Sequence, residues 1–396
     1  MTKKYKYNFD EFIDRRNTRC HKWDGENPMY RKSENLLPLW VADMDFQSPK
    51  PIIDAIIKRA EHGFFGYSFF PDEYFEAVIN WFQRHYNWKL ERNWIVFTPG
   101  VVPAIFLSVQ AYSEPGDKVI IQTPAYPPFA ASAKDNGRKR LLNPLKLING
   151  RYEMDFEDLK KKVKEPGVKM IILCNPHNPT GRVWTTEELT QLGEICLKNQ
   201  VLVVSDEIHG DIIFPDHKFT AFASISEEFA QNSITCTSPS KPFNYPSLKV
   251  SNIIIPNSKL RGKFIEIRKK SALRDPNCFA SLVVEAAYNE CEDWLEEMIK
   301  YVKGNLEYLK TFIKQNLPLV KVIEPDGTYL LWLDFRDLGY NTKELTNIIK
   351  GKAKVALEDG FLFGKAGRGF QRINIACPRS ILEEALTRIS TAFNSE

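Results

Sequence analysis

The chain has 396 residues, 43% of them hydrophobic and 26% charged, which is the balance of a globular protein large enough for two or three domains. Its 54 basic and 50 acidic residues give a net charge of +4, too small to indicate a nucleic acid or a membrane surface as partner. This composition excludes a disordered chain, a collagen-like fibre and a coiled-coil rod.

Short strands alternate with amphipathic helices through the first two thirds of the chain. One helix is predicted over 71–86, and a second over 187–199, where Thr185 and Glu188 form a capping box. Continuous apolar runs, typical of strands covered on both faces, predict strands at 118–122, 169–174, 201–205, 233–237 and 250–255. The alternation predicts an α/β fold, with a large domain built on a mainly parallel sheet with helices on both faces.

The pattern changes near residue 285. One long helix is predicted over 285–315, followed by strands at 320–324 and 328–334, a helix at 342–350, a strand at 372–376 and a last helix at 380–393. Strands and helices no longer alternate strictly, which indicates a smaller α+β domain. We therefore expect an N-terminal segment packing with the small domain (1–47), a large domain (48–284) and a small C-terminal domain (285–396).

The chain is expected to be cytoplasmic. No apolar run approaches the ~20 residues of a membrane-spanning helix, and residues 1–16 contain no apolar stretch of a secretory signal. The seven cysteines are scattered and form no C-x-x-C pair, which favours free thiols in a reducing compartment.

A lysine follows the end of a predicted strand in the segment Thr235-Cys-Thr-Ser-Pro-Ser-Lys241. Ligands of open α/β sheets bind beyond the carboxyl ends of the strands. A lysine placed there can form a Schiff base with an aldehyde, and an apolar pocket lowers its pKa and helps it to do so. Taken alone, a lysine in such a loop is more often an ordinary surface residue.

The segment Val203-Val-Ser-Asp206-Glu-Ile-His209 places an acid after the next strand. Its carboxylate could keep a cationic ring nitrogen protonated through a charge-assisted hydrogen bond. One alternative is that Asp206 caps a helix. Another is a metal site, although no HExxH-like spacing occurs; its ligands would be Asp206, His209, Asp211 and His217.

Two further junctions carry binding features. In Asn175-Pro-His-Asn178-Pro-Thr-Gly181, proline and glycine fix a loop and a turn that leave the Asn178 amide free to donate, although turn chemistry alone also explains this segment. Thr98-Pro-Gly100-Val101-Val102 lies between a strand and a helix, where free N–H groups and the helix dipole favour a phosphate.

An arginine and an aromatic residue complete the set. Arg372 lies inside an alternating strand, where its fork suits a ligand carboxylate or a structural ion pair. Tyr126 follows another strand end and could stack on a planar ring, or belong to the core. Lysine, acid, amide, anion-binding helix start, aromatic ring and arginine together are what pyridoxal phosphate requires of a protein.

These motifs resemble those of the fold type I pyridoxal-phosphate enzymes of the aminotransferase superfamily. In order they are Gly100, Tyr126, Asn178-Pro-Thr-Gly181, Asp206, Ser238-Pro-Ser-Lys241 and Arg372. More narrowly, the chain is similar to the cystathionine β-lyase (cysteine-S-conjugate β-lyase) branch. The segments that carry this likeness are Leu39-Trp-Val-Ala-Asp-Met-Asp-Phe46, Gly66-Tyr67, Asp206-Glu-Ile-His209, 327–335 and 372–379.

The resemblance implies the fold, with pyridoxal 5'-phosphate as cofactor, and a role for each matching residue. As catalytic residues, Lys241 would carry the cofactor and move a proton, Asp206 would pair with the ring nitrogen, and Tyr126 would stack on the ring. The expected cofactor-binding residues are these three with Val101, Val102, Asn178, His209, Ser238, Lys249 and Tyr67. Arg372 would bind the substrate α-carboxylate, with Ala42 and Asn178 as further substrate-binding residues. No metal is expected.

The segment after Lys241 departs from the pattern of this branch. Pro242 offers no N–H donor, and Ser247 would be strained if its φ were positive. Lys249 stands where many relatives carry a phosphate-binding arginine, and it offers a point charge in place of a fork. His209 stands where aminotransferases usually carry a tyrosine.

The implied activity is β-elimination of cystathionine or a related cysteine S-conjugate, giving a thiol, pyruvate and ammonia. An aminotransferase is the alternative within the superfamily, and a regulatory binding protein is the alternative from another class. The implied assembly is a homodimer in which Tyr67 reaches the partner's site, and residues 64–70 are dense enough in aromatics to belong in an interface or a core. Its partners would be an amino-acid substrate and a second copy, with no nucleic acid and no membrane.

Overall fold

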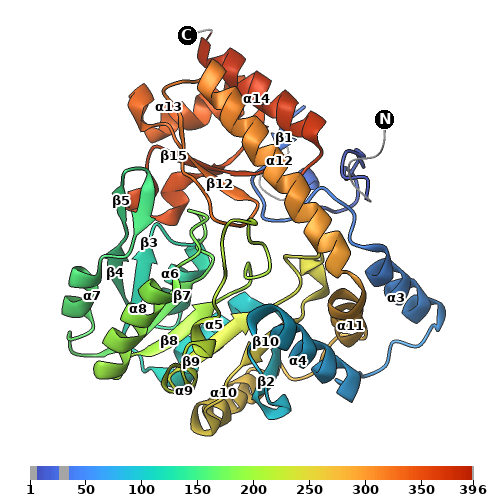
Figure 1. Cartoon of the computed structure of the whole chain (residues 1–396), viewed down its shortest axis with the longest axis vertical. Helices are drawn as coiled ribbons and strands as arrows, with labels where there is room; N and C mark the ends of the chain where they lie inside the picture. The colour runs from blue at the N-terminus through green and yellow to red at the C-terminus, as the bar shows by residue number, and fades with distance from the viewer. Residues whose placement is uncertain (1–6, 26–34, 395–396) are drawn as a thin grey trace.

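The computed structural model describes residues 7–25 and 35–394. Its larger layered part is a seven-stranded sheet (Figure 1). In spatial order the strands are β2 (Ile95–Thr98), β10 (Ser251–Ile254), β9 (Ser233–Thr237), β8 (Leu202–Asp206), β7 (Val168–Cys174), β3 (Lys118–Thr123) and β4 (Lys139–Pro144). All run parallel except β10, which pairs antiparallel with β2 and β9. The predicted mainly parallel sheet is confirmed.

Helices cover both faces of this sheet, as predicted. Along β3, Val119 and Ile121 point into one apolar cluster while Ile120 points into the other, the alternation expected of a strand buried on both sides. One face carries α5 (Val101–Tyr112), α6 (Pro127–Asp135) and α10 (Ser258–Lys270). The other carries α7 (Phe156–Lys162), α8 (Thr186–Lys198) and α9 (Glu227–Gln231). The predicted capping box of α8 is present, with Thr185 and Glu188 each accepting the other's backbone N–H.

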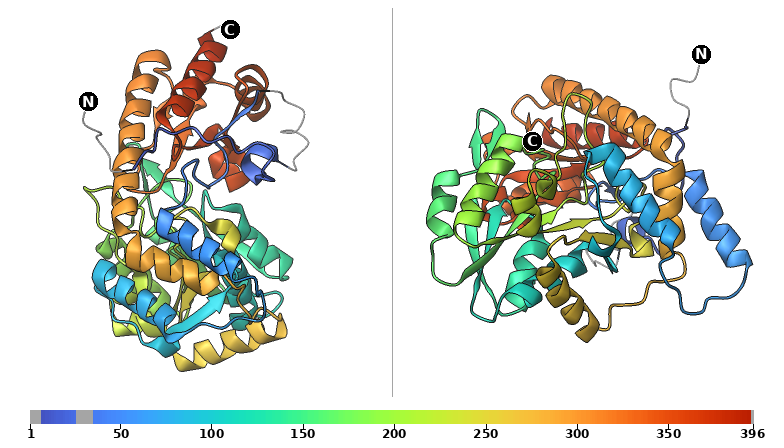
Figure 2. Two further views of the ribbon diagram at one scale, coloured as in Figure 1. Left: turned by 90° about the vertical axis from the view of Figure 1, so that its right-hand side faces the viewer. Right: turned by 60° about the horizontal axis from the view of Figure 1, so that its bottom comes forward.

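A four-stranded antiparallel sheet forms the smaller part, at the opposite end of the molecule from the large sheet (Figure 2). Its strands, in spatial order, are β11 (Lys321–Val322), β12 (Leu330–Asp334), β15 (Phe370–Asn374) and β14 (Glu358–Asp359). The helices here are α12 (Glu292–Asn316), α13 (Thr342–Thr346), which continues as a π-helix over Asn347–Lys352, and α14 (Arg379–Asn394).

The N-terminal segment reaches this smaller part. Its strand β1 (Leu37–Pro38) pairs with β13 (Val355–Ala356), and the short helix α1 (His21–Asp24) precedes it. One apolar cluster runs from Phe9 through α4 (Asp72–Tyr86) and α12 to α14. The expected boundary after residue 284 falls inside α11 (Ala280–Glu290), and the domain limits stay predictions.

The predicted single helix over 285–315 is wrong: it is two helices, α11 and α12. The chain leaves helical geometry at Cys291, whose φ and ψ are −117° and 13°. The bend lets α11 pack against α3 (Lys50–Glu61) and α4, while α12 continues to α14. Apolar residues keep helical spacing through the bend because both helices bury a face, so the periodicity does not reveal it. The hairpin of β5 (Lys146–Ile148) and β6 (Arg151–Glu153) was not predicted either.

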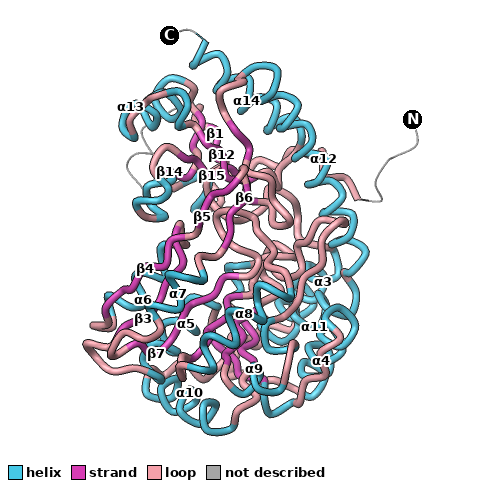
Figure 3. Tube along the Cα trace, turned by 60° about the vertical axis from the view of Figure 1, so that its left-hand side comes forward, coloured by secondary structure: helices cyan, strands magenta, loops and turns pink. Residues whose placement is uncertain are grey.

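The loops between the two sheets form the centre of the molecule, as the pink segments of Figure 3 show. They include residues 39–46, which join β1 to the large part ahead of α3. Among the described residues, no helix is both long and apolar enough to cross a membrane.

Candidate active site

A cavity lies beyond the carboxyl ends of β7, β8 and β9. It collects most of the predicted site residues, namely Ala42, Val101, Val102, Tyr126, Asn178, Asp206, His209, Lys241 and Lys249. Arg372 is joined to this group through Asn178, whereas Ser238 and Tyr67 do not line the cavity. The fold therefore brings most of these residues together around one cavity, and their individual roles stay predictions.

One wall of the cavity is the start of α5. Gly100 is the N-cap residue, with φ 125°, a conformation that glycine adopts at little cost. The helix begins at Val101, so the N–H groups of Val101 and Val102 have no partner within the helix. Both residues line the cavity, and free N–H groups at the positive end of a helix dipole suit a phosphate.

Asp206 is the last residue of β8 and is buried. Its Oδ1 accepts a hydrogen bond from the N–H of Ile208 at 3.2 Å. Burial raises the pKa of Asp206 to about 7, against the opposing effect of that hydrogen bond and of Lys241. A protonated ring nitrogen beside this carboxyl would lower that pKa again, because an opposite charge favours the ionised form.

The alternatives for Asp206 do not hold. No helix starts after it, since the chain enters a turn, so it is not a helix cap. The alternative metal ligands are dispersed: Asp211 accepts hydrogen bonds from Trp81 and Tyr86, and His217 lies 3.4 Å from Asp326. Within the described part of the chain, no group of three or more His, Cys, Asp and Glu residues is arranged to hold a metal ion.

Lys241 enters the cavity from the loop that follows β9. Its Nζ donates a hydrogen bond to the Ala42 carbonyl at 2.6 Å. Burial lowers the pKa of Lys241 to about 8, although Asp43 and Asp206 oppose the shift. An amine with this pKa is largely neutral above pH 8, and it is then a nucleophile and a base.

Arg372 is buried in β15 and contacts the cavity through Asn178. Its Nη1 donates to Asn178 Oδ1 at 3.0 Å, and its Nη2 donates to the Trp40 carbonyl at 2.9 Å. Glu358, its cross-strand neighbour, has Oε2 3.7 Å from Nη2. The Arg372 Nε is buried and has no hydrogen-bond partner among the described residues, so one donor of the guanidinium is left unpaired.

His209 is buried beside the cavity, and its Nδ1 has no hydrogen-bond partner among the described residues. Burial lowers the pKa of His209 to about 3, so the ring is neutral at working pH. Tyr126 lines the cavity as well, and burial raises its pKa. A buried nitrogen without a partner fits a site whose polar groups pair with a bound ligand.

The structure differs from the prediction after Lys241. Ser238 donates its hydroxyl to the Val250 carbonyl at 2.7 Å, and it is Ser240 that lines the cavity. The expected strain at Ser247 is absent: the positive φ angles are at Asn244 (58°) and Lys249 (51°). The turn there is set by Asn244, whose side chain bonds the backbone of residues 44 and 46, and asparagine tolerates this conformation.

Several residues near the site were not predicted from the sequence. Cys174, Ser240, Pro246 and Val250 line the cavity. Tyr329 donates its hydroxyl to the Ala42 carbonyl at 3.2 Å. Tyr329 lies in the segment 327–335 that carried the family likeness, so this segment was the available signal for it.

A large parallel sheet with a lysine, an acid and an anion-binding helix start at its strand ends, joined to a small antiparallel sheet, defines a type I aminotransferase fold. The family Aminotransferase class I and II matches residues 34–389, and the chain belongs to this family.

Three similar proteins narrow this assignment. Cystathionine beta-lyase PatB of Bacillus subtilis is 44% identical, over 98% of this chain and 100% of PatB. The PLP-bound putative aminotransferase of Clostridium difficile has 45% identity and a TM-score of 0.95, covering 98% of this chain and 100% of that one. Cystalysin of Treponema denticola, whose crystal structure contains pyridoxal 5'-phosphate, has 38% identity and a TM-score of 0.95, covering 98% and 99%.

We expect Asp206→Asn to lower turnover by roughly 100-fold or more, the scale of a lost electrostatic group in an active site. Steady-state kinetics at saturating cofactor measure this. Glu207→Gln is the matched control, because Glu207 is an adjacent buried carboxyl whose pKa burial also raises to about 7, yet it bonds Ser205 and the Phe222 N–H outside the cavity. Near-normal turnover in Asp206→Asn would mean that Asp206 has only a structural role.

Arg372→Lys replaces a fork by a point charge. We expect kcat/KM to fall roughly 10- to 100-fold, which corresponds to about 1.5–3 kcal/mol for hydrogen bonds to a charged group. Arg336→Lys is the control, since that fork is occupied by Asp334 at 2.7 and 2.8 Å and the kinetics should not change. Unchanged kinetics in Arg372→Lys would mean that Arg372 pairs only with the carboxylate of Glu358 and does not bind the substrate.

Proposed function

We propose that this protein is a pyridoxal-phosphate-dependent carbon–sulfur β-lyase that acts on cystathionine or a related cysteine S-conjugate. Its products are a thiol, pyruvate and ammonia. The observation that carries the proposal is the convergence of Lys241 and Asp206 on one cavity beside the start of α5. The 44% identity to a cystathionine β-lyase over nearly the whole chain supports the choice of substrate class.

The residues around the cavity fit this cofactor. The N–H groups of Val101 and Val102, with Lys249, would hold the phosphate. Asn178 and His209 offer polar groups to the ring hydroxyl, and Tyr126 offers its ring face. Bound there, pyridoxal phosphate supplies an electron sink that allows the substrate Cα to lose its proton.

The proposed roles in the reaction are divided among four residues. The Lys241 amine removes the Cα proton, a task for which a pKa near the working pH is best suited. Asp206, ionised by a cationic partner, holds the positive charge on the ring nitrogen. Arg372 and Asn178 bind and orient the substrate α-carboxylate. Departure of the thiol from Cβ then leaves the fragment that water converts to pyruvate and ammonia.

An aminotransferase is the second candidate, since the similar Clostridium difficile protein is described as a putative one. It needs the same residues up to loss of the Cα proton, so the products separate the two. The holoenzyme is incubated with cysteine conjugates, with and without 2-oxo acids. Equal amounts of thiol and pyruvate without a 2-oxo acid support the lyase, whereas amino transfer without thiol release overturns it.

We expect Lys241→Ala to lower turnover by at least roughly 1,000-fold while the chain stays folded, because one amine serves as cofactor anchor and base. Turnover and circular dichroism measure the two effects. Lys249→Ala, the other lysine of the cavity, should weaken cofactor affinity and keep turnover once the cofactor saturates. Substantial lyase activity in Lys241→Ala contradicts the assignment.

We also propose that the protein is a homodimer with shared active sites. Tyr67 is fully exposed in the single chain, and Phe64, Phe65 and Phe69 are 59–77% exposed around it. The alternative that these rings pack within one subunit therefore fails for these four. So many exposed aromatics mark an interaction surface, and a two-fold dimer is the commonest way to cover one. Tyr67 of the partner subunit would then reach the phosphate.

Subunit complementation tests the shared site. Tyr67→Ala and Lys241→Ala chains, each nearly inactive, should regain activity when mixed, because half the sites of a mixed dimer then carry neither change. Mixing Lys241→Ala with Asp206→Asn is the control: both residues face the same chain's cavity, so every mixed site keeps one defect. No recovery in the first mixture, with mixed dimers proven, contradicts the shared site.

A further inference from the structure

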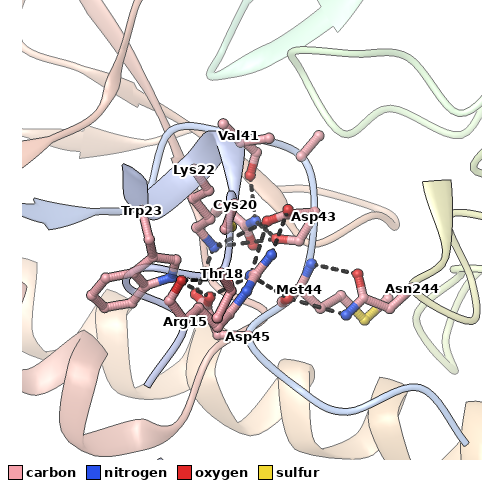
Figure 4. A network of polar contacts seen from close by, with 12 residues as sticks. Arg15, Thr18, Cys20, Lys22, Trp23, Val41, Asp43, Met44, Asp45 and Asn244 are labelled. Carbon is pink, nitrogen blue, oxygen red and sulfur yellow. Dashed lines mark hydrogen bonds and ion pairs between the residues drawn. The ribbon is translucent and has the colours of Figure 1, made fainter. Parts of the chain in front are cut away.

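Residues 39–46, which we call the strap, cross from the small sheet to the large one. On the small-sheet side, Asn374 Nδ2 donates to the carbonyls of Val41 and Asp43 at 2.7 and 2.6 Å. On the large-sheet side, Asn244 bonds the N–H and the carbonyl of Met44 at 2.9 and 3.1 Å (Figure 4). The backbone of the strap is therefore fixed from both parts.

The strap contacts two cationic groups of the proposed site, Lys241 and Arg372. The Ala42 carbonyl accepts the hydrogen bond from Lys241 Nζ, and Tyr329 donates to the same oxygen. Two residues earlier, the Trp40 carbonyl accepts from Arg372. The position of the strap thus bears directly on where the amine and the guanidinium lie.

Four charged residues fasten the strap to the N-terminal segment, and we call them the clasp: Arg15, Lys22, Asp43 and Asp45. Lys22 Nζ donates to Asp45 Oδ2 at 2.6 Å and to the Asp43 carbonyl at 3.2 Å. Arg15 donates to both carboxylates at 2.7–3.2 Å. Figure 4 shows these groups converging on the residues that follow Ala42.

The clasp is buried at its centre. The Lys22 side chain is 0% exposed and the Asp45 side chain 3% exposed. Removing the two charged groups from water costs several kcal/mol per ion before they pair. Apolar residues of equal volume at such positions often give an equally stable structure. What a fully hydrogen-bonded ion pair adds is a defined geometry, here three residues along the strap from Ala42, whose carbonyl oxygen receives Lys241.

We propose that Lys22 and Asp45 are positioning residues that, through the strap, hold the Ala42 carbonyl where it accepts a hydrogen bond from the free Lys241 amine. With one N–H donated to that oxygen, the lone pair of the neutral amine is directed away from the strap. The inference rests on the proposed role of Lys241 as the base. It gives the N-terminal segment a role in orienting the Lys241 amine.

The acceptor also affects protonation of the amine. A carbonyl oxygen that accepts a hydrogen bond from the amine favours its ammonium form. If this oxygen moves away, one interaction that opposes the effect of burial is lost, and the pKa of Lys241 falls. The charged groups that face Lys241 are Asp43, Arg372, Asp206 and Lys249. Changes in the clasp alter the surrounding charge as well as the position of the oxygen. The effect of charge on the pKa of Lys241 changes sign with the charge removed, whereas the effect of position always lowers this pKa.

Two variants separate position from charge. Lys22→Met removes a positive charge and Asp45→Asn a negative one, so direct electrostatics moves the pKa of Lys241 up in the first and down in the second. If the clasp acts by position, both variants lower this pKa, by about half a unit or more. The measurement is acetylation of Lys241 by acetic anhydride against pH, in the cofactor-free full chain, quantified by mass spectrometry.

Lys350→Met is the matched control. Lys350 and Asp359 form another mostly buried pair at 2.7 Å, so the variant should lose stability without moving the pKa of Lys241. If Lys22→Met does not fold, Lys22→Met with Asp45→Asn removes both charges together and should still lower it. Shifts of opposite sign, no shift, or an equal shift in Lys350→Met overturn the proposal.

Kinetics of the loaded enzyme give a second readout. A misdirected base should lower kcat roughly tenfold in Lys22→Met, less than the roughly 100- to 10,000-fold that a positioned base contributes, with KM changed less than twofold. A change in KM alone overturns the positioning role. The acetylation experiment involves no substrate, so failure of the proposed lyase activity and failure of this inference are separately observable.

Discussion

The cost of burying charge is the constraint on which this site depends. Burial acts on the two principal groups in opposite directions, lowering the pKa of Lys241 to about 8 and raising that of Asp206 to about 7. Both effects require an apolar surrounding, which the cavity wall provides with residues such as Val101, Cys174 and Val250. The same layered architecture therefore gives an amine that is basic near neutral pH and a carboxyl whose ionised form is stabilised by a cationic partner.

The site also depends on contacts between the two sheets. Lys241 and Asp206 follow strands of the large sheet, whereas Arg372 lies in the small one and reaches Asn178 across the interface. The strap adds a third link, since it contacts Lys241 and Arg372 through neighbouring carbonyls. The proposed base and the proposed carboxylate-binding group are thus set at a distance fixed by packing between the two parts.

Much of the large sheet and of the candidate site could be predicted, because the signals for both are local in the sequence. Continuous apolar runs located β3, β7, β8, β9 and β10 but not β2 and β4. Lys241, Asp206 and Asn178 lie at or after the ends of three of the located strands. The bend at Cys291 could not be predicted, because apolar periodicity continues through it. Which of Ser238 and Ser240 faces the cavity depends on the turn after β9. The clasp was not recognisable either, since Lys22 and Asp45 resemble surface charges until tertiary packing buries them.

The strap has a consequence for the order in which the molecule is built. Its hydrogen bonds join residues 200 positions apart at Asn244 and 333 apart at Asn374, and contacts of such sequence separation form only after the intervening chain has been ordered. During synthesis, Lys241 and Asp206 emerge well before residue 374. The Ala42 carbonyl that accepts the hydrogen bond of Lys241 is therefore fixed in place only once the last strand of the small sheet exists, so an incomplete chain carries Lys241 without this contact.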